Sequence, residues 1–456
     1  MKKSPGFSLM LAEYALLWRL ARPFVARHKR LRDDFSLRLA PDAWKLPFVA
    51  DLWIQAASGG ESFLTRQLLA ELNALVAQDE PQVALRVLCT SCTRQGLDVL
   101  EAARVHGKTA WPHLDVAVRV FPLDEPKIMR RARGMVSPKA VVLLETELWP
   151  GLMAACAEEG VPLVTVNGRM TEKSYSGYRW FTPLWKKIAP SRVLAMADAD
   201  ASRFAALFGQ DRVSVMPNMK FDGVPLSAPA PDPQSPVMKL LPHDLPVVLL
   251  ASVREEEEQL LAPVLEYLRE HAPEAVIAVA PRHMERVGYW QDILQRTIGN
   301  HAVVLASALE EKGRTATAGQ AVLWDRFGQL LALYGRADAV FVGGSLAPLG
   351  GQNFLEAAGQ GRVPVIGAYW KNFAWVGEEF FAAGLGKRVT GADELGPALL
   401  QSLRNAPDPE IVRLKMAAYI APRRGGTRMA AEAVWDVVRN SQAVLSRGAA
   451  FAGLPS

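Results

Sequence analysis

A carboxylate that follows two glycines is the first feature of the sequence that could do acid–base chemistry. Glu61 closes the segment ASGGE at 57–61, at the end of the apolar run 52–58. The run predicts a strand and the glycines predict a tight turn into a helix, so Glu61 and Gly60 would lie at the carboxyl end of that strand. A carboxylate there is well aimed as a general base. The local sequence favours the plainer alternative, a charge that stabilises the helix N-terminus.

Two further carboxylates follow a second apolar run. Glu145 and Glu147 come after residues 140–144, in the segment ETELWP at 145–150. If the strand continues that far, its period of two puts both side chains on the same side. Packing alone rarely places two carboxylates at the end of a buried strand. A catalytic role and a structural role stay open for both residues.

A glycine-rich turn is the strongest local signal. The segment GGSLAPLGGQNFLEAA at 343–358 runs from a buried strand through two glycine pairs into a helix. Exposed backbone N–H groups and a helix N-terminus would together make a phosphate cradle. Glu356 lies one helical turn beyond Gln352 and could accept hydrogen bonds from ribose hydroxyls. The glycine spacing differs from the dinucleotide fingerprint.

Two arginines follow predicted strands. Arg169 lies in NGRMTEKS at 167–174 and could clamp a carboxylate or phosphate, with a loop salt bridge as the alternative. Arg282 lies in PRH at 281–283, and a cation in that place suits an anionic leaving group. The acidic run 255–258 is interpreted as a solvated helix start.

The elements that must position these residues alternate regularly. Short apolar runs without polar alternation, separated by amphipathic stretches, predict parallel strands covered on both faces by helices. The expected strands are 52–58, 84–91, 116–122, 140–145, 162–168 and 192–197, then 246–252, 275–281, 302–307, 321–325, 339–344 and 364–367.

A proline-rich segment divides the two series of strands. Residues 223–246 hold seven prolines, which no helix or central strand would sustain, so we expect a linker. The prediction is a 41–222 acceptor-binding α/β domain and a 247–456 nucleotide-sugar-binding α/β domain. Ligands bind at the carboxyl ends of parallel strands, so two Rossmann-like domains facing a cleft are expected.

The N-terminal 1–40 segment carries the basic character. It holds nine Lys or Arg and three Asp or Glu, a net +6, whereas the whole chain has +5. An apolar stretch with Tyr14 and Trp18, followed by cations, is typical of a helix lying in the interface of an anionic membrane. The alternative is a helix packed on its own domain. A nucleic-acid-binding protein would spread its cations over the folded body, so no nucleic-acid partner is expected.

Composition excludes several classes of protein. A chain of 456 residues, half of them apolar, with no clean apolar run of spanning length, is neither disordered nor a multi-span membrane protein. Three cysteines make no disulfide framework. The histidines are dispersed and the one Cys-X-X-Cys pair stands alone, so we expect no metal site and no cofactor.

These motifs, in this order, resemble those of the Kdo (3-deoxy-D-manno-octulosonic acid) transferases of lipopolysaccharide synthesis. The resemblance covers nearly the whole chain. The matching segments are AASGGE at 56–61, TSCTRQG at 90–96, ETELWP at 145–150, NGRMTEKS at 167–174, MKFD at 219–222, ASVREEEE at 251–258, PRH at 281–283, YGRADAVFVGGSLAPLGGQNFLEAA at 334–358 and NF at 372–373.

The resemblance implies a glycosyltransferase B fold and an inverting, metal-independent transfer of Kdo from CMP-Kdo to a lipid A precursor, at the cytoplasmic face of the inner membrane. Glu61 would be the general base, and Glu145 or Glu147 the second essential carboxylate. Gly60, Arg169 and Lys220 would bind the acceptor or line the cleft. The donor would be held by Ser252, Arg282, Gly344, Ser345, Gly350, Gly351, Asn353 and Glu356.

The sequence departs from the family pattern at three motif positions. Gln55 stands where the family usually has His, and Gln352 and Phe354 replace the His and Pro of the second glycine turn. Glutamine donates a hydrogen bond but carries no charge, so donor choice is open. A glycosyltransferase of the same fold using another nucleotide sugar, or a silent membrane scaffold that keeps the nucleotide pocket, are the alternatives.

Overall fold

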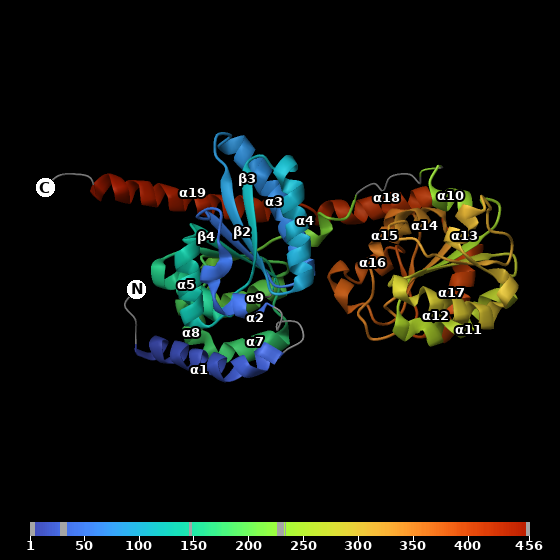
Figure 1. Cartoon of the computed structure of the whole chain (residues 1–456), viewed down its shortest axis with the longest axis horizontal. Helices are drawn as coiled ribbons and strands as arrows, with labels where there is room; N and C mark the ends of the chain where they lie inside the picture. Colours follow the sequence, from blue (N-terminus) through green and yellow to red (C-terminus); the bar gives the residue numbers. More distant parts are fainter. Residues whose placement is uncertain (1–4, 28–33, 146–147, 226–231, 233, 453–456) are drawn as a thin grey trace. The chain divides into compact units, whose positions relative to one another are not determined.

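The computed structural model describes residues 5–27, 34–145, 148–225, 232 and 234–452 (Figure 1). It divides into two compact units. Unit 1 is made of Met1–Gly223 together with Arg423–Ser456, and unit 2 of Val224–Pro422. Each contains its own parallel sheet with helices on both faces, as the alternation of apolar runs predicts.

Unit 1 is built on a seven-stranded parallel sheet in the order β3-β2-β1-β4-β5-β6-β7. The order reverses between β1 and β4, which pair directly, so the ligand site of such a sheet is expected at their carboxyl ends. Both strands are buried at every residue, which explains their unbroken apolar sequences. The strands are β1 Leu52–Ala56, β2 Leu85–Ser91, β3 Leu114–Val120, β4 Ala140–Leu144, β5 Leu163–Gly168, β6 Arg192–Ala195 and β7 Val213–Val215.

Two apolar layers cover the sheet of unit 1. Alternate residues of β1 point to opposite faces, so Ile54 packs with helices α3, α4 and α19 while Trp53 packs with α5, α6 and α9. The helices of the unit are α1 Pro5–Arg27, α2 Phe35–Leu39, α3 Gly59–Asp79, α4 Arg94–Ala110, α5 Pro126–Val136, α6 Pro150–Glu159, α7 Glu172–Tyr178, α8 Thr182–Lys187, α9 Asp198–Phe208 and α19 Gly426–Ala452.

Unit 2 has a second seven-stranded parallel sheet, in the order β10-β11-β9-β8-β12-β13-β14. Here the direction of winding changes between β8 and β12, which are neighbours. The strands are β8 Val247–Val253, β9 Val276–Pro281, β10 Val303–Leu305, β11 Ala321–Leu323, β12 Ala339–Val342, β13 Val365–Ile366 and β14 Lys387–Arg388. The helices are α10 Pro236–Leu240, α11 Glu258–His271, α12 Val287–Ile298, α13 Ala306–Glu311, α14 Leu330–Arg336, α15 Leu355–Gly359, α16 Glu379–Ala382, α17 Ala392–Arg404 and α18 Pro409–Ile420.

The end of the chain returns to unit 1, whereas the sequence placed all of 247–456 in the second domain. α19 packs against α3, and its start is held by Asp222, which accepts hydrogen bonds from Gly425 N, Thr427 N and Thr427 Oγ1, each at 2.7 Å. Such a contact joins residues about 200 positions apart in the chain, so no local sequence pattern predicts it.

The proline-rich segment 223–246 is also more structured than a linker where the structure describes it. Pro236 begins α10, because proline is tolerated in the first turn of a helix, and Val237 and Leu240 of that helix are buried. Arg336 of α14 donates to the carbonyls of Pro242 and Leu245, which fixes the end of the segment to unit 2.

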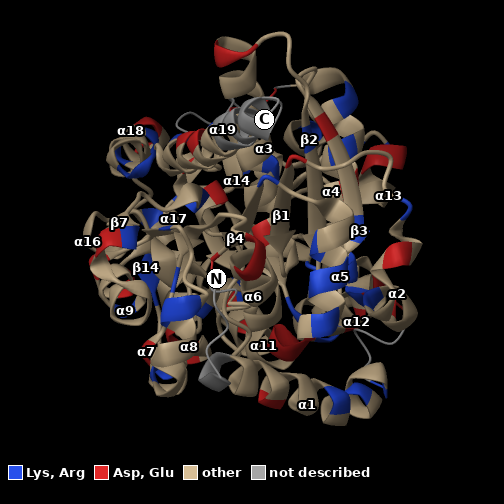
Figure 2. Cartoon of the chain, turned by 90° about the vertical axis from the view of Figure 1, so that its left-hand side faces the viewer, with Lys and Arg blue, Asp and Glu red and all other residues tan. Residues whose placement is uncertain are grey.

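α1 is packed on unit 1 along one face. Leu11 is buried, the Tyr14 hydroxyl donates to Asp124 at 2.9 Å, and Arg22 pairs with Glu125. Glu13, Arg19 and Arg27 of the helix are exposed, and Figure 2 shows charged positions along α1. Several apolar side chains of the helix are exposed as well. These side chains, 55 to 74% exposed, are Leu9, Leu16, Leu17, Leu20 and Phe24. Among the described residues, no helix combines the length and the apolar character needed to cross a bilayer.

Candidate active site

The turn after β1 places Glu61 at the carboxyl edge of the unit 1 sheet. Ser58 caps α3 by accepting a hydrogen bond from Glu61 N, and Glu61 Oε2 accepts one from Ala57 N at 2.5 Å. The side chain is 6% exposed. These hydrogen bonds are the ones expected if Glu61 stabilises the start of its own helix, the structural alternative to a general base. They also fix the direction in which the carboxylate points.

The two glycines before Glu61 have different surroundings. A Cβ on Gly59 would lie 2.9 Å from Gln95 Cδ of α4, so a larger residue there would have to displace the exposed Gln95 side chain. A Cβ on Gly60 would meet only Ser58 Oγ, at 3.9 Å. Packing within unit 1 does not explain Gly60, and the backbone there is open to close approach.

Glu145 follows the neighbouring strand, β4, and is held by a charged and a neutral partner. Its Oε1 lies 2.5 Å from Lys220 Nζ and 3.5 Å from Asn167 Nδ2. The Glu145 side chain is 14% exposed and Glu61 is buried. The two carboxylates follow adjacent strands, β4 and β1. Glu147 lies outside the described residues.

Asn167 at the end of β5 is a site residue that sequence reasoning missed. It is fully buried, and its Oδ1 accepts a hydrogen bond from Met219 N, so it ties the end of β5 to the short helix Met219–Phe221 that carries Lys220. Asn167 and Glu145 have φ values of 53° and 55°. Residues other than glycine in that region cost about 1–3 kcal/mol each and cluster at functional sites. The signal in the sequence was a polar amide inside an otherwise apolar strand, one residue before its end.

Arg169 lies beside this cluster. Its backbone N–H donates to Glu145 O at 3.4 Å. The side chain is half-buried and makes no ion pair within the described part of the chain, so the alternative role, a loop salt bridge, is not seen there. The carboxyl edge of unit 1 therefore brings together Glu145, Asn167, Arg169 and Lys220, with Glu61 after the adjacent strand.

In unit 2, the predicted ribose-binding carboxylate, Glu356, is half-buried beside the half-buried Asn353 and the buried Tyr334. Burial raises the pKa of Glu356, while the Asn353 hydrogen bond and the Arg282 charge lower it. Asn353 Nδ2 donates to Glu356 Oε1 at 2.8 Å. Burial and the charge of Glu356 raise the pKa of the Tyr334 hydroxyl. A hydrogen-bonding ligand that reaches this cluster would meet an acceptor with few other partners.

The first glycine turn is already filled by a side chain of the protein. The amides of Gly344, Ser345 and Leu346 all donate to the carboxylate of Glu257. Ser345 Oγ in turn donates to Val342 O and accepts from Gly367 N. These groups are occupied within unit 2, so the phosphate cradle expected from the whole segment cannot include them.

The acidic run 255–258 is correspondingly only half solvated. Glu255 and Glu256 are exposed as expected, but Glu257 is fully buried and Glu258 is 5% exposed. Glu258 pairs with Arg286 through two hydrogen bonds of 2.9 and 2.6 Å. The interpretation of this run as a solvated helix start was wrong for its second half.

The second glycine turn rests on the first. Gly351 N donates to Gly344 O at 2.6 Å and Gln352 N to Gly343 O at 3.1 Å. Gly350 has φ of 91°, which favours glycine, and a Cβ there would also displace the exposed Asn372 side chain, whose Nδ2 would lie 2.6 Å away. Ser252, at the end of β8, also has a positive φ of 53° and its carbonyl lies against Gly343.

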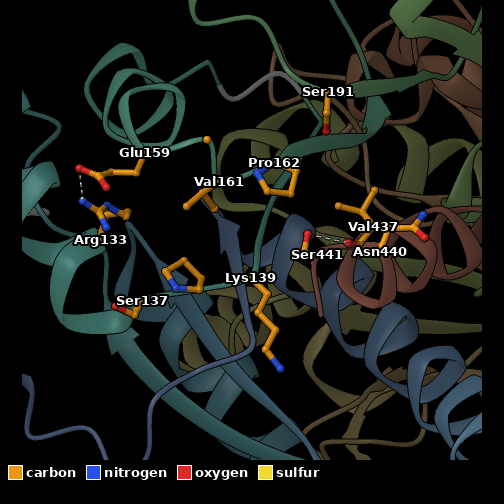
Figure 3. Close-up of a pocket in the computed structure, with 12 residues that line it drawn as sticks. Arg133, Ser137, Lys139, Glu159, Val161, Pro162, Ser191, Val437, Asn440 and Ser441 are labelled. Carbon is orange, nitrogen blue, oxygen red and sulfur yellow. Dashed lines mark hydrogen bonds and ion pairs between the residues drawn. The ribbon is translucent and has the colours of Figure 1, made fainter. Parts of the chain in front are cut away.

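Two hollows of unit 1 lie on other parts of its surface. One of about 650 Å³ opens at the amino ends of β4, β5 and β6, where its cations are already paired, Arg133 with Glu159 and Lys139 with Asp51 (Figure 3). A second, of about 660 Å³, lies between α3 and α4 and is lined by Phe63, Arg66, Gln95, Val99, Ala102 and His106 among others. Gln95 also packs on Gly59, so this second groove begins beside the Glu61 turn.

The sequence is similar to those of known Kdo transferases. Residues 23–223 match the family model described as 3-deoxy-D-manno-octulosonic-acid transferase (kdotransferase). The 3-deoxy-D-manno-octulosonic acid transferase of Bordetella pertussis is 28% identical over 405 residues, covering 86% of this chain and 88% of that protein. The Haemophilus influenzae enzyme of the same name is 27% identical, covering 71% of each chain. The chain is thus similar to Kdo transferases over most of its length, and residues 23–223 match the model of that family.

The fold of this Kdo transferase homologue is that of a glycosyltransferase. A glycosyltransferase from Rickettsia africae aligns with 86% of this chain and all of its own, at 12% identity and a TM-score of 0.52. Two Rossmann-like α/β units, expected from the sequence, are confirmed. Among the described residues, no three His, Cys, Asp or Glu side chains group as ligands of a metal ion would.

Two of the three departures from the Kdo transferase pattern are explained by internal packing. Gln55 is fully buried, where its Oε1 accepts from Thr90 Oγ1 at 2.6 Å and its Nε2 donates to Cys92 Sγ. Phe354 is 1% exposed and packs against the rings of Phe373 and Phe380, with centroids 5.3 Å away in each case. Both side chains serve the core of their unit.

Proposed function

We propose that the protein transfers Kdo from CMP-Kdo to a lipid A precursor, with inversion and with Glu61 as general base. The observation that carries the proposal is the pair of carboxylates, Glu61 and Glu145, at the switch point of the unit 1 sheet. Similarity to that family supports the sugar, because the curated relatives bear the name of Kdo transferases.

The reaction needs one displacement. Glu61 takes the proton of an acceptor hydroxyl as its oxygen attacks the anomeric carbon of Kdo. The bond from that carbon to the phosphate oxygen breaks on the opposite side, and CMP leaves with the electron pair. Arg282 balances the charge on the departing phosphate, which is the role expected of a metal ion in other glycosyltransferases. Turnover should therefore persist in the presence of a chelator.

The donor is held by unit 2 in this proposal. Glu356 accepts from the ribose hydroxyls, and Gly350, Gly351 and Asn353 line the turn that receives the phosphate. Since the Gly344 and Ser345 amides bind Glu257, these two residues act by supporting the turn. Ser252 lies against Gly343 and serves the same purpose.

The acceptor is held by unit 1. Gly60 leaves room beside the base, and Arg169 and Lys220 lie near Glu145. The groove between α3 and α4 joins apolar side chains, Phe63 and Val99, to the cation of Arg66, as a substrate with acyl chains and phosphate requires.

The decisive experiment replaces Glu61 by glutamine. The carboxamide oxygen can still accept from Ala57 N, so the turn should keep its shape while the base is lost. We expect turnover to fall by about 10²- to 10⁴-fold with CMP affinity changed less than about threefold. Glu71→Gln, on the same helix, is the control. Unimpaired transfer by the Glu61 variant would remove this residue from the mechanism.

Donor choice is tested directly with purified protein. CMP-Kdo and uridine nucleotide sugars are offered together with a lipid A precursor, and consumption of each is followed by mass spectrometry. Use of a uridine sugar alone would favour the same-fold transferase with another donor. Binding of CMP without any transfer would favour a silent scaffold.

We also propose that α1 lies on the cytoplasmic face of the inner membrane. Its outward face combines exposed leucines and Phe24 with arginines, which suits an anionic leaflet. Because Leu11 and Tyr14 attach the helix to unit 1, deletion would disturb the core, and the better test replaces Leu16, Leu17 and Leu20 by serine. Binding to vesicles containing phosphatidylglycerol should fall at least about tenfold. Leu414→Ser, equally exposed on α18, is the control, and unchanged binding would contradict the proposal.

A further inference from the structure

We propose that Glu257 is a positioning residue for the donor, in that its carboxylate fills the amide nest of the first glycine turn and so holds both glycine turns in their binding shape. The inference rests on the proposed function, since it names which residue of unit 2 shapes the donor site. It also says which amides are closed to the donor phosphate.

The geometry is that of an anion in a nest. Glu257 Oε2 accepts from Gly344 N at 2.6 Å, and Oε1 accepts from Ser345 N at 2.9 Å and Leu346 N at 3.0 Å. Three successive N–H groups that converge on one anion are the arrangement by which loops bind phosphate. Oε2 also accepts from Arg254 N at 3.0 Å. The side chain has no exposed surface.

The contact spans the switch point of the unit 2 sheet. Glu257 follows β8, whereas the turn follows β12, so the carboxylate joins the ends of two neighbouring strands. The fit is close, because a Cβ on Gly343 would lie 2.8 Å from Glu257 Oε2 and 2.7 Å from Ser252 O. A side chain at position 343 would therefore force Glu257 or the backbone of Ser252 and Val253 to move.

The effect of Glu257 reaches the donor residues through backbone hydrogen bonds. Gly344 O accepts from Gly351 N and Gly343 O accepts from Gln352 N, so the second turn is built on the first. Asn353 and Glu356 follow directly, with Asn353 Nδ2 bonded to Glu356. If the first turn loses its anion, the amides of Gly344 to Leu346 need other partners and the second turn loses its support.

Glutamine is the informative replacement. Its size matches, but its NH₂ group would face at least one backbone N–H, because all four partners of Glu257 are donors. We expect the dissociation constant of CMP and the KM for CMP-Kdo to rise about 10- to 100-fold, while kcat and the KM for acceptor change less than about threefold. The matched control is Glu256→Gln, since Glu256 is exposed and its nearest cation, Arg254, is 3.7 Å away.

Rescue separates positioning from folding. In Glu257→Ala, formate or acetate at high concentration should refill the nest and restore much of the CMP affinity. Loss without rescue, together with an equal fall in kcat and a rise in both KM values, would mean that Glu257 only stabilises the fold. Unchanged CMP affinity in a folded Glu257→Gln protein would overturn the inference.

Hydrogen exchange makes the test independent of the donor. In the wild-type protein the amides of 344–346 should exchange slowly, and in Glu257→Gln at least about tenfold faster. Fast exchange in the wild type would refute the nest whatever the substrate is. Slow exchange in a protein that does not bind CMP would refute the proposed function and leave the nest intact.

Discussion

The ion pair between Lys220 and Glu145 offers a quantitative test of the unit 1 site. Lys220→Met, Glu145→Gln and the double variant form a cycle in which kcat is measured for each protein. The two charges lie 2.5 Å apart, which at an effective dielectric constant of about 20 corresponds to a gross attraction of about 7 kcal/mol.

Desolvation offsets most of that attraction. The side chains of Lys220 and Glu145 are 24% and 14% exposed, so solvent screens the pair only partly. We expect a net coupling of about 1–3 kcal/mol. If the pair acts as one unit, each single variant should lose about 10- to 100-fold in kcat and the double variant no more than either.

A surface pair on the same unit is the control. Arg203 and Glu172 lie 3.0 Å apart, but Glu172 is 71% exposed, so their coupling should stay below about 1 kcal/mol. Kinetics are preferred to unfolding here, because a chain of two units need not unfold in one step. Strictly multiplicative losses in the Lys220 and Glu145 cycle would refute the reasoning.

Two further predictions concern the supports of unit 1. Asp222→Ala removes three 2.7 Å hydrogen bonds from the start of α19, so trypsin should cleave after Arg423 or Arg424 at least about tenfold faster; an unchanged rate would show that α19 is held by its apolar contacts alone. Burial raises the pKa of Asp124 from 3.8 to about 7, against the hydrogen bonds from two α6 amides and Tyr14, so the folded state keeps this proton longer than the unfolded state. The contribution of Asp124 to the free energy of unfolding, up to about 4 kcal/mol, is therefore complete below pH about 4 and is lost as the pH rises through about 7. In denaturant unfolding at a series of pH values, Asp124→Asn should not show this loss of stability with rising pH.

The strands were predictable because buried parallel strands are local features. Runs such as 84–91 and 140–145 became β2 Leu85–Ser91 and β4 Ala140–Leu144, within one residue at each end. The strands that the sequence analysis did not name, β7 and β14, are three and two residues long and partly exposed, so they have no apolar run to reveal them. The pattern of apolar residues detects buried strands, and β7 and β14 are largely not buried.

The site was predictable only in part. A carboxylate after an apolar run is visible in the sequence, so Glu61 and Glu145 were named, and the structure puts them after adjacent strands. Asn167 was missed because an Asn-Gly pair at the end of a strand resembles the start of an ordinary turn. Its importance depends on contacts with Met219 and Glu145, which lie 52 and 22 positions away.

The sequence by itself determined the two α/β units, the resemblance to Kdo transferases and the carboxylates, because each depends on runs of neighbouring residues. Only the tertiary structure decided what fills the first glycine turn. From the sequence Glu257 looked like a solvated charge, whereas it lies buried against amides some 87 to 89 positions further along the chain. A local pattern shows that a nest for an anion exists, but which anion occupies it depends on what the fold brings there.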